Sequence, residues 1–152
     1  MKLKDRARIG IPPIKEGLKS LDALMDGGIP RGNVVIVTGP TGSGKSTFSL
    51  QFLINGAKLG ERGSYISFEQ SYEDIVYLAS NFNWDIKKLE NEGKLKIMSF
   101  RISDNILSIN EEIRKHLQSF KPDRLVIDSI SSYLIEMEAI GYREIILDYN
   151  LR

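Results

Sequence analysis

The sequence predicts an α/β protein built on an open, mostly parallel sheet that is flanked by helices. Short apolar runs rich in β-branched residues recur along the 152 residues, helical patterns separate them, and a glycine-rich loop follows the first run. Strands that alternate with helices favour parallel pairing, because each helix carries the chain back to the start of the next strand. A hydrophobic content of 41% is sufficient for one packed core.

Four segments fit strands of this sheet. Residues 34–37 and 125–127 are the clearest, because both are aliphatic runs bounded by turn-forming or charged residues. Residues 64–68 and 95–100 are weaker candidates that lie between them in the chain. We expect the first two segments to be buried, with 34–37 leading directly into the glycine-rich loop.

Helical patterns occupy the intervals between these strands. The first helix carries apolar residues from Phe48 onward and stops near Gly60. The second begins at a capping pair, Ser71 and Asp74. The third ends before Pro122, and its apolar stripe consists of Ile106, Ile109, Ile113, Leu117 and Phe120.

The two ends of the chain differ from this core. Residues 1–13 read as a flexible N-terminal arm, so the expected domain occupies residues 14–152. Residues 133–152 predict a helix pair, or one helix broken near Gly141. No further strand is predicted after 125–127.

Composition excludes several classes of function. Lys and Arg number 21 against 20 Asp and Glu, so the net charge of +1 creates no general attraction to nucleic acid or anionic lipid. The absence of cysteine excludes a disulfide framework and fits a reducing compartment. No segment reads as a signal peptide or a membrane span. We expect a cytoplasmic protein that binds neither membranes nor, as its main partner, nucleic acid.

A complete phosphate-binding loop joins the first strand to the first helix. The pattern is a glycine, four residues and then Gly-Lys-Ser, in the setting between strand and helix that the mechanism requires. Glycines let backbone N–H groups converge on phosphate oxygens, and the positive end of the helix points at the same anion. We expect ATP to bind at Gly39, Pro40, Thr41, Gly42, Ser43, Gly44, Lys45 and Ser46.

A carboxylate for a metal ion follows the strand at 125–127. Asp128 stands in the arrangement known as Walker B, where it can hold a water bound to Mg²⁺. Ser46 offers a hydroxyl to the same ion, and Lys45 supplies an ammonium to the β- and γ-phosphates. We therefore predict that Ser46 and Asp128 form the metal site.

Glu69 is the candidate general base, and with Lys45 it forms the predicted catalytic pair. It follows the strand at 64–68, which we expect to neighbour the strand before the loop, and ligands collect beyond the carboxyl ends of parallel strands. Gln70 can hydrogen-bond a water molecule but cannot accept its proton. The alternative interpretation of Glu69 is an exposed loop residue.

Other polar residues receive structural interpretations. Ser129, Ser131 and Ser132 read as helix-cap or turn residues, with Ser129 as an alternative contact of the metal site. His116 is the one histidine, and we interpret it as a solvated helix position rather than a catalytic group.

Long stretches of the sequence resemble the KaiC group of RecA-superfamily ATPases. The resemblance runs from about Ile9 to Ser132 and includes GGIPRG at 27–32, the phosphate-binding loop and RLVIDS at 124–129. It implies a RecA-like P-loop NTPase core, ATP with Mg²⁺, and self-association into rings or filaments with nucleotide at subunit boundaries. It also implies further strands after the Walker B strand, so we expect the sheet of this chain to be incomplete at its C-terminal end. It also implies that Glu69 is the first of a catalytic carboxylate pair, whose second position is Gln70 in this chain.

Several functions remain open from the sequence. The leading one is a Mg-dependent ATPase that acts as a nucleotide-controlled regulatory or assembly switch and could also phosphorylate itself. A nucleotide-binding module with little turnover is the first alternative, favoured by Gln70. A recombinase-like DNA-dependent ATPase is the second, disfavoured by the near-neutral charge. A protein partner that covers the incomplete sheet is a further expectation.

Overall fold

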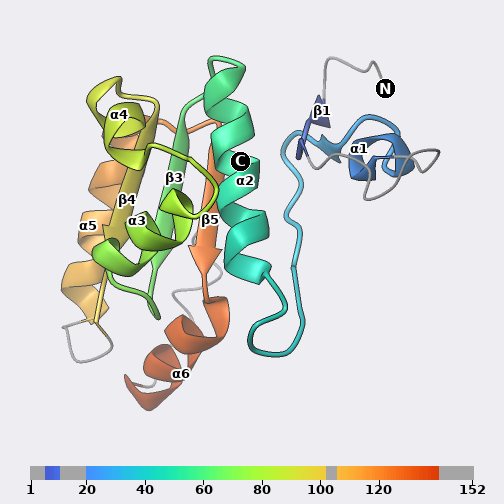
Figure 1. The fold of residues 1–152 in the computed structure, drawn as a ribbon. Helices are drawn as coiled ribbons and strands as arrows, with labels where there is room; N and C mark the ends of the chain where they lie inside the picture. The colour runs from blue at the N-terminus through green and yellow to red at the C-terminus, as the bar shows by residue number, and fades with distance from the viewer. Residues whose placement is uncertain (1–5, 11–19, 102–105, 141–152) are drawn as a thin grey trace.

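The computed structural model describes residues 6–10, 20–101 and 106–140. Helices and strands alternate along most of this length (Figure 1). In chain order they are β1 Arg6–Ala7, α1 Leu21–Leu24, β2 Ile29–Pro30, α2 Lys45–Lys58, β3 Gly63–Ser67, α3 Tyr72–Ser80, α4 Ile86–Asn91, β4 Leu95–Ser99, α5 Ile106–Phe120, β5 Arg124–Asp128 and α6 Ile130–Ile140.

The main sheet has three parallel strands in the order β4-β3-β5. Ser67, the last residue of β3, lies opposite Ser99 of β4 and Asp128 of β5, so all three strands end at one level. The parallel strands predicted at 64–68, 95–100 and 125–127 are therefore confirmed, with small shifts of their ends. The residues that follow β3 and β5 meet at a common edge, as expected for an open α/β sheet.

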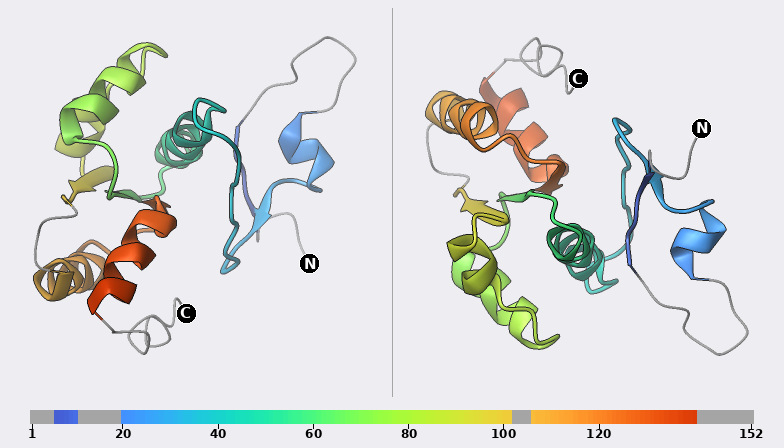
Figure 2. Two further views of the ribbon diagram at one scale, coloured as in Figure 1. Left: turned by 90° about the horizontal axis from the view of Figure 1, so that it is seen from below. Right: turned by 90° about the horizontal axis from the view of Figure 1, so that it is seen from above.

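Helices cover both faces of this sheet, giving three layers (Figure 2). On one face, side chains of α2, α3 and α4 pack on β3 and β4 around Leu53, Tyr65 and Ile75. On the other face, α5 and α6 pack around Ile66, Phe68 and several isoleucines of α5. Because side chains alternate along a strand, Tyr65 and Ser67 face α2, whereas Ser64 and Ile66 face α5.

The predicted buried strand at 34–37 is wrong. These residues adopt no strand conformation and are exposed, with Val34 at 74% and Ile36 at 76% of their full accessible surface. Figures 1 and 2 show the segment outside the sheet, as an extended connection between the N-terminal elements and α2. The apolar pattern predicts only that the segment is extended, whereas a strand also needs a partner for its backbone. Strand β3 cannot be that partner, because β4 and β5 pair with it on both sides.

The N-terminal elements form a small unit that docks on α2. Strand β1 pairs antiparallel with β2, and both oxygens of Asp22 accept backbone N–H groups, from Ile9 at 2.7 Å and Gly10 at 2.9 Å. Residues 6–10 of the expected arm are thus described as part of this unit, while 1–5 and 11–13 lie outside the described residues. Helix α6 begins the helical region predicted after Tyr133, and residues 141–152 also lie outside the description.

A buried arginine fastens this unit to the core. Arg124, with 1% of its side chain exposed, donates to Glu61 at 2.5 Å and to the carbonyl of Arg8 at 2.6 Å. Its guanidinium also lies 4.5 Å from the centre of the Phe52 ring. On α2, Asn55 donates to the same Arg8 carbonyl at 3.0 Å.

None of the described helices is long and apolar enough to cross a membrane.

Candidate functional site

The phosphate-binding loop opens directly into helix α2. Gly44 caps the helix in the left-handed conformation, with φ of 87°, and Gly42 has φ of 80°. Gly44 offers no side chain to cap the first turn of α2, and the first backbone N–H groups of a helix have no acceptor within the helix itself. A side chain at Gly39 would meet Ser43 Oγ at 2.7 Å. This arrangement of glycines suits an anion bound by backbone N–H groups.

Lys45 closes the loop from inside. Its Nζ donates to the carbonyl oxygens of Gly39 at 2.9 Å and Pro40 at 3.0 Å. Residues 39–44 of the predicted loop, including Thr41 and Ser43, are exposed to solvent. The ammonium group therefore lies over the loop backbone, where the oxygens of a phosphate group would compete with these two carbonyls.

Ser46 and Asp128 lie 82 residues apart in the chain but come together at one end of the sheet. Ser46 lies in the first turn of α2 and Asp128 at the end of β5, and Ser46 Oγ donates to Asp128 Oδ2 at 2.7 Å. Tyr65 of β3 donates its hydroxyl to the same oxygen. Burial and the neighbouring Asp128 carboxylate raise the pKa of Tyr65 far above its usual value, so the phenol keeps its proton.

Ser46 and Asp128 fit a magnesium ion. Mg²⁺ takes oxygen ligands and is held in such proteins by one or two protein groups together with water and phosphate oxygens. A hydroxyl and a carboxylate joined by a hydrogen bond form such a donor set. The described residues include no group of three or more His, Cys, Asp or Glu that could hold a metal. An ion at this site would need water and phosphate to complete its shell.

Glu69 is held by two hydroxyl groups of the segment after β5. Ser129 donates its Oγ proton to Glu69 Oε1, and Ser132 Oγ donates to the same oxygen at 2.8 Å. These hydrogen bonds lower the pKa of Glu69 against the opposing effect of burial, and the positive charge of Lys45 lowers it to a smaller extent. The carboxylate is thus ionised at neutral pH and near the ammonium of Lys45.

One expectation for this region changes in the structure. Strand β3, which leads to Glu69, has β4 and β5 as its neighbours rather than the segment at 34–37. Gln70 is fixed by its backbone, because its carbonyl accepts from Ser67 at 2.8 Å and Ser99 at 2.7 Å. Its side-chain oxygen Oε1 is buried and has no hydrogen-bond partner within the described part of the chain.

Sequence reasoning missed three residues of this site. The sequence places Tyr65 only within a strand, and for Ser129 and Ser132 it predicts a cap or turn, with Ser129 also as an alternative contact of the metal site. Ser129 Oγ does accept the Ser132 backbone N–H at 3.2 Å, but the contact of both hydroxyls with Glu69 is not predicted. Their signal lies in the register of the sheet. Ser67 lies opposite Asp128, and Tyr65 is on the same face two residues earlier, so its side chain points to the α2 side with Asp128. The sequence alone does not supply this register.

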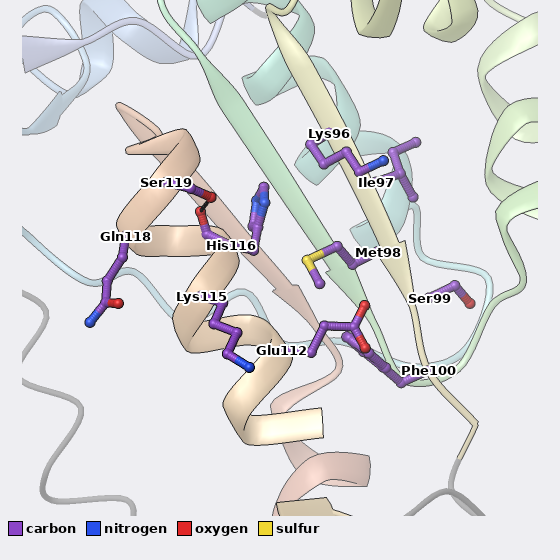
Figure 3. A pocket seen from close by; sticks show the side chains of 10 residues that line it. All are labelled: Lys96, Ile97, Met98, Ser99, Phe100, Glu112, Lys115, His116, Gln118 and Ser119. Atoms are coloured by element: carbon purple, nitrogen blue, oxygen red, sulfur yellow. Dashed lines mark hydrogen bonds between the residues drawn. The ribbon is translucent and has the colours of Figure 1, made fainter. Parts of the chain in front are cut away.

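A hollow of about 820 Å³ lies away from these residues, between β4 and α5 (Figure 3). It is lined by residues 96–100 and by one side of α5, including His116. His116 Nε2 is hydrogen-bonded to the buried Ser64 Oγ at 2.8 Å, and its ring stacks on Phe120. The interpretation of His116 as a solvated residue is therefore wrong, because the strand beneath α5 places a hydroxyl within its reach.

Known proteins are similar to this chain over most of its length. A sequence model of the KaiC ATPase family matches residues 14–150. The chain is 32% identical to the circadian clock oscillator protein KaiC of Parathermosynechococcus lividus, over 87% of this chain and 26% of that protein. It is 34% identical to a UPF0273 protein of Pyrococcus furiosus, over 88% of this chain and 60% of that protein.

A solved structure gives the same result for the fold. The crystal structure of a KaiC-like protein from Pyrococcus horikoshii OT3 matches with a TM-score of 0.79 and 36% identity, over 95% of this chain and 63% of that one. The predicted α/β fold of the RecA-like kind is confirmed. The chain spans less than two thirds of the length of each of these three proteins.

Proposed function

Since the chain belongs to the KaiC family of ATPases, we propose that it binds ATP with Mg²⁺ at the loop 39–46 and hydrolyses it with Glu69 as general base. The observation that carries this proposal is the hydrogen bond between Ser46 and Asp128, which are 82 residues apart in sequence. The start of α2 meets the end of β5 there, and the N-cap of α2 makes no side-chain hydrogen bond. Glu69 lies close enough to Lys45 for the positive charge to lower its pKa.

Binding would rearrange few groups. The phosphates would accept the N–H groups of the loop and first turn of α2, and Lys45 Nζ would exchange the carbonyls of Gly39 and Pro40 for phosphate oxygens. Ser46 and Asp128 would hold Mg²⁺, which neutralises charge on the phosphates when bound. Ser46 can keep donating its proton to Asp128 while its oxygen faces the ion.

Hydrolysis would use Glu69 to orient and deprotonate water. Its ionised carboxylate can accept a proton, and Ser129 and Ser132 fix the direction in which Glu69 Oε2 points by engaging Oε1. The same hydrogen bonds lower the pKa of Glu69 and make it a weaker base. This opposition favours modest turnover.

The test separates binding from hydrolysis. Removing the Lys45 ammonium (Lys45→Ala) should weaken binding of a fluorescent ATP analogue about 10- to 100-fold, the value of a charge-assisted hydrogen bond. Glu69→Gln should leave binding intact and reduce phosphate release about 100-fold or more. Lys58→Ala, on the exposed last turn of α2, and Glu73→Gln, on the exposed first turn of α3, are matched controls.

Each result has a clear opposite. Unchanged binding in Lys45→Ala would refute the ATP site, and equal phosphate release in Glu69→Gln would remove Glu69 from the mechanism. The second candidate function, a nucleotide-binding module with little turnover, is favoured by Gln70. Tight binding of ATP with no phosphate release from the wild type would support this module instead of an ATPase.

We further infer that the nucleotide controls assembly, which would make the protein a regulatory switch. The support is the exposed aliphatic segment 34–37, which leads straight into the loop that would hold the phosphates. A second copy of the chain is the proposed occupant, because an extended apolar segment with an unpaired backbone suits another strand. Sedimentation with and without Mg-ATP tests this link, and identical distributions would exclude it.

A further inference from the structure

Tyr65 is a buried aromatic residue whose hydroxyl contacts the candidate site. It sits in the middle strand of the sheet, its exposed fraction is zero, and its ring packs among apolar side chains of α2 such as Leu50 and Leu53. A buried hydroxyl needs a hydrogen-bond partner, and this one has the Asp128 carboxylate. The hydroxyl of a buried residue in the middle strand is thus hydrogen-bonded to a predicted metal ligand.

The geometry divides the two oxygens of Asp128 between two tasks. Both hydrogen bonds that the described residues donate to this side chain, from Ser46 and Tyr65, end on Oδ2. Within the described part of the chain, Oδ1 therefore receives no donor. A carboxylate held by one oxygen from two directions cannot rotate freely about its side-chain bonds, and its other oxygen keeps a fixed direction.

The contribution of Tyr65 differs from that of Ser46. Ser46 Oγ would itself contact the metal ion, so its hydrogen bond to Asp128 is part of the metal site. Tyr65 reaches Asp128 on the sheet face that α2 covers, and the packed core around its ring holds the phenol in place. Its position is set before any ligand arrives, whereas the Ser46 hydroxyl can turn.

On this basis we propose that Tyr65 is a positioning residue that orients Asp128 for the metal ion of a bound nucleotide. This role rests on the proposed function, because it requires that Asp128 serve Mg²⁺. Hydrogen-bond partners of metal-binding groups typically change metal affinity by 10- to 100-fold when they are removed. Loss of the phenol hydroxyl should therefore weaken the response to Mg²⁺ and leave metal-free contacts between loop and phosphate unchanged.

The experiment is a Mg²⁺ titration of the binding of a fluorescent ATP analogue to the full chain, started in excess chelator. Tyr65→Phe removes one oxygen and keeps the ring that fills the core. We expect it to raise the Mg²⁺ concentration at half-saturation about 10-fold or more, and to leave binding in chelator as in the wild type. Tyr72→Phe is the matched control, because Tyr72 also donates to a carboxylate, Glu90, at 2.6 Å, away from the site.

The outcomes separate the two proposals. A wild type that binds no nucleotide refutes the proposed function itself. Equal Mg²⁺ midpoints for the wild type and Tyr65→Phe refute only the role of Tyr65, and so does an equal shift in Tyr72→Phe, which would indicate a general effect of losing a phenol.

A double-mutant comparison tests whether Tyr65 acts through Asp128. In Asp128→Asn the carboxylate is gone, so adding Tyr65→Phe should cause no further change in the Mg²⁺ midpoint if Tyr65 acts only through Asp128. A further shift of the same size as in the wild-type background would overturn the proposal. Circular dichroism of each variant without nucleotide confirms that the compared proteins are folded.

Discussion

Neutral hydroxyl groups orient both carboxylates of the site. Tyr65 and Ser46 donate to Asp128, and Ser129 and Ser132 donate to Glu69. A hydroxyl fixes the direction of a carboxylate without cancelling its charge, whereas a lysine or arginine in the same place would compete with a metal ion or with the proton of a water molecule. At the scale of single residues, the site keeps its negative charge available for chemistry.

His116 should make the stability of the protein depend on pH. Burial, followed by the positive charge of Lys96, lowers the pKa of His116 from 6.5, against the opposing effect of Glu112. Below about pH 6.5 the unfolded chain takes up a proton that the folded chain resists, so the free energy of unfolding should fall as the pH decreases. Urea unfolding of the wild type at pH 8 and pH 5 measures this change.

The comparison that isolates His116 is the variant His116→Gln. A glutamine can still hydrogen-bond Ser64 but does not titrate, so the decrease in stability between pH 8 and pH 5 should be smaller than in the wild type. Carboxylates elsewhere contribute equally to both proteins and cancel in the difference. An identical pH dependence would show that His116 is as easily protonated in the folded protein as in the unfolded chain.

At the scale of helices and strands, the sequence predicts elements with local causes and fails where the cause is distant. Helix α3 begins where Ser71 and Asp74 form the expected capping box, because both hydrogen bonds lie within four residues. Segment 34–37 has a strand pattern but no strand conformation, because pairing depends on segments remote in sequence. The contact of Tyr65 with Asp128 has the same origin, since it follows from the register of β3 and β5.

Helix α2 depends on a glycine where it passes over the start of β5. A side chain at Gly56 would lie 2.5 Å from Arg124 Nε, which is bonded to Glu61. Alanine normally stabilises a helix interior by about 1 kcal/mol relative to glycine. Here we expect Gly56→Ala to lower the free energy of unfolding by about 2 kcal/mol or more, because displacing Arg124 from its partners outweighs that gain.

Denaturant unfolding measures this effect, and Gly60 provides a control. Gly60 lies just after α2, and a side chain there would meet no atom within 4 Å, although its φ of 84° strains any other residue. Gly60→Ala should therefore be destabilising by about 1 kcal/mol through backbone strain alone. A Gly56→Ala protein as stable as the wild type would show that Arg124 moves aside without loss.

In the whole molecule, polar contacts join helices and strands at two levels, one at each end of the main sheet. At one end of the sheet, Arg124 and Asn55 hold the carbonyl of Arg8 and so attach the N-terminal unit to the core. At the other end, Ser46 links α2 to β5 through Asp128, and Ser132 links α6 to Glu69, which follows β3. The exposed segment 34–37 runs between these two levels, so a partner that binds it can affect both.

The aliphatic side chains of this segment predict self-association of the 152-residue chain. Val34 and Ile36 are 74% and 76% exposed, and an extended apolar segment with unpaired backbone groups is prone to pair with another copy. Replacing both by threonine keeps the β-branched shape and removes apolar surface, so Val34→Thr with Ile36→Thr should shift the size distribution towards the monomer. Light scattering across a concentration series gives the dissociation constant, which we expect to rise about 10-fold or more for a loss of about 1.5 kcal/mol.

Leu107→Thr on α5, where Leu107 is 47% exposed, controls for a general effect of apolar surface. A wild type that stays monomeric, or a double variant that associates as strongly as the wild type, would place the contact elsewhere.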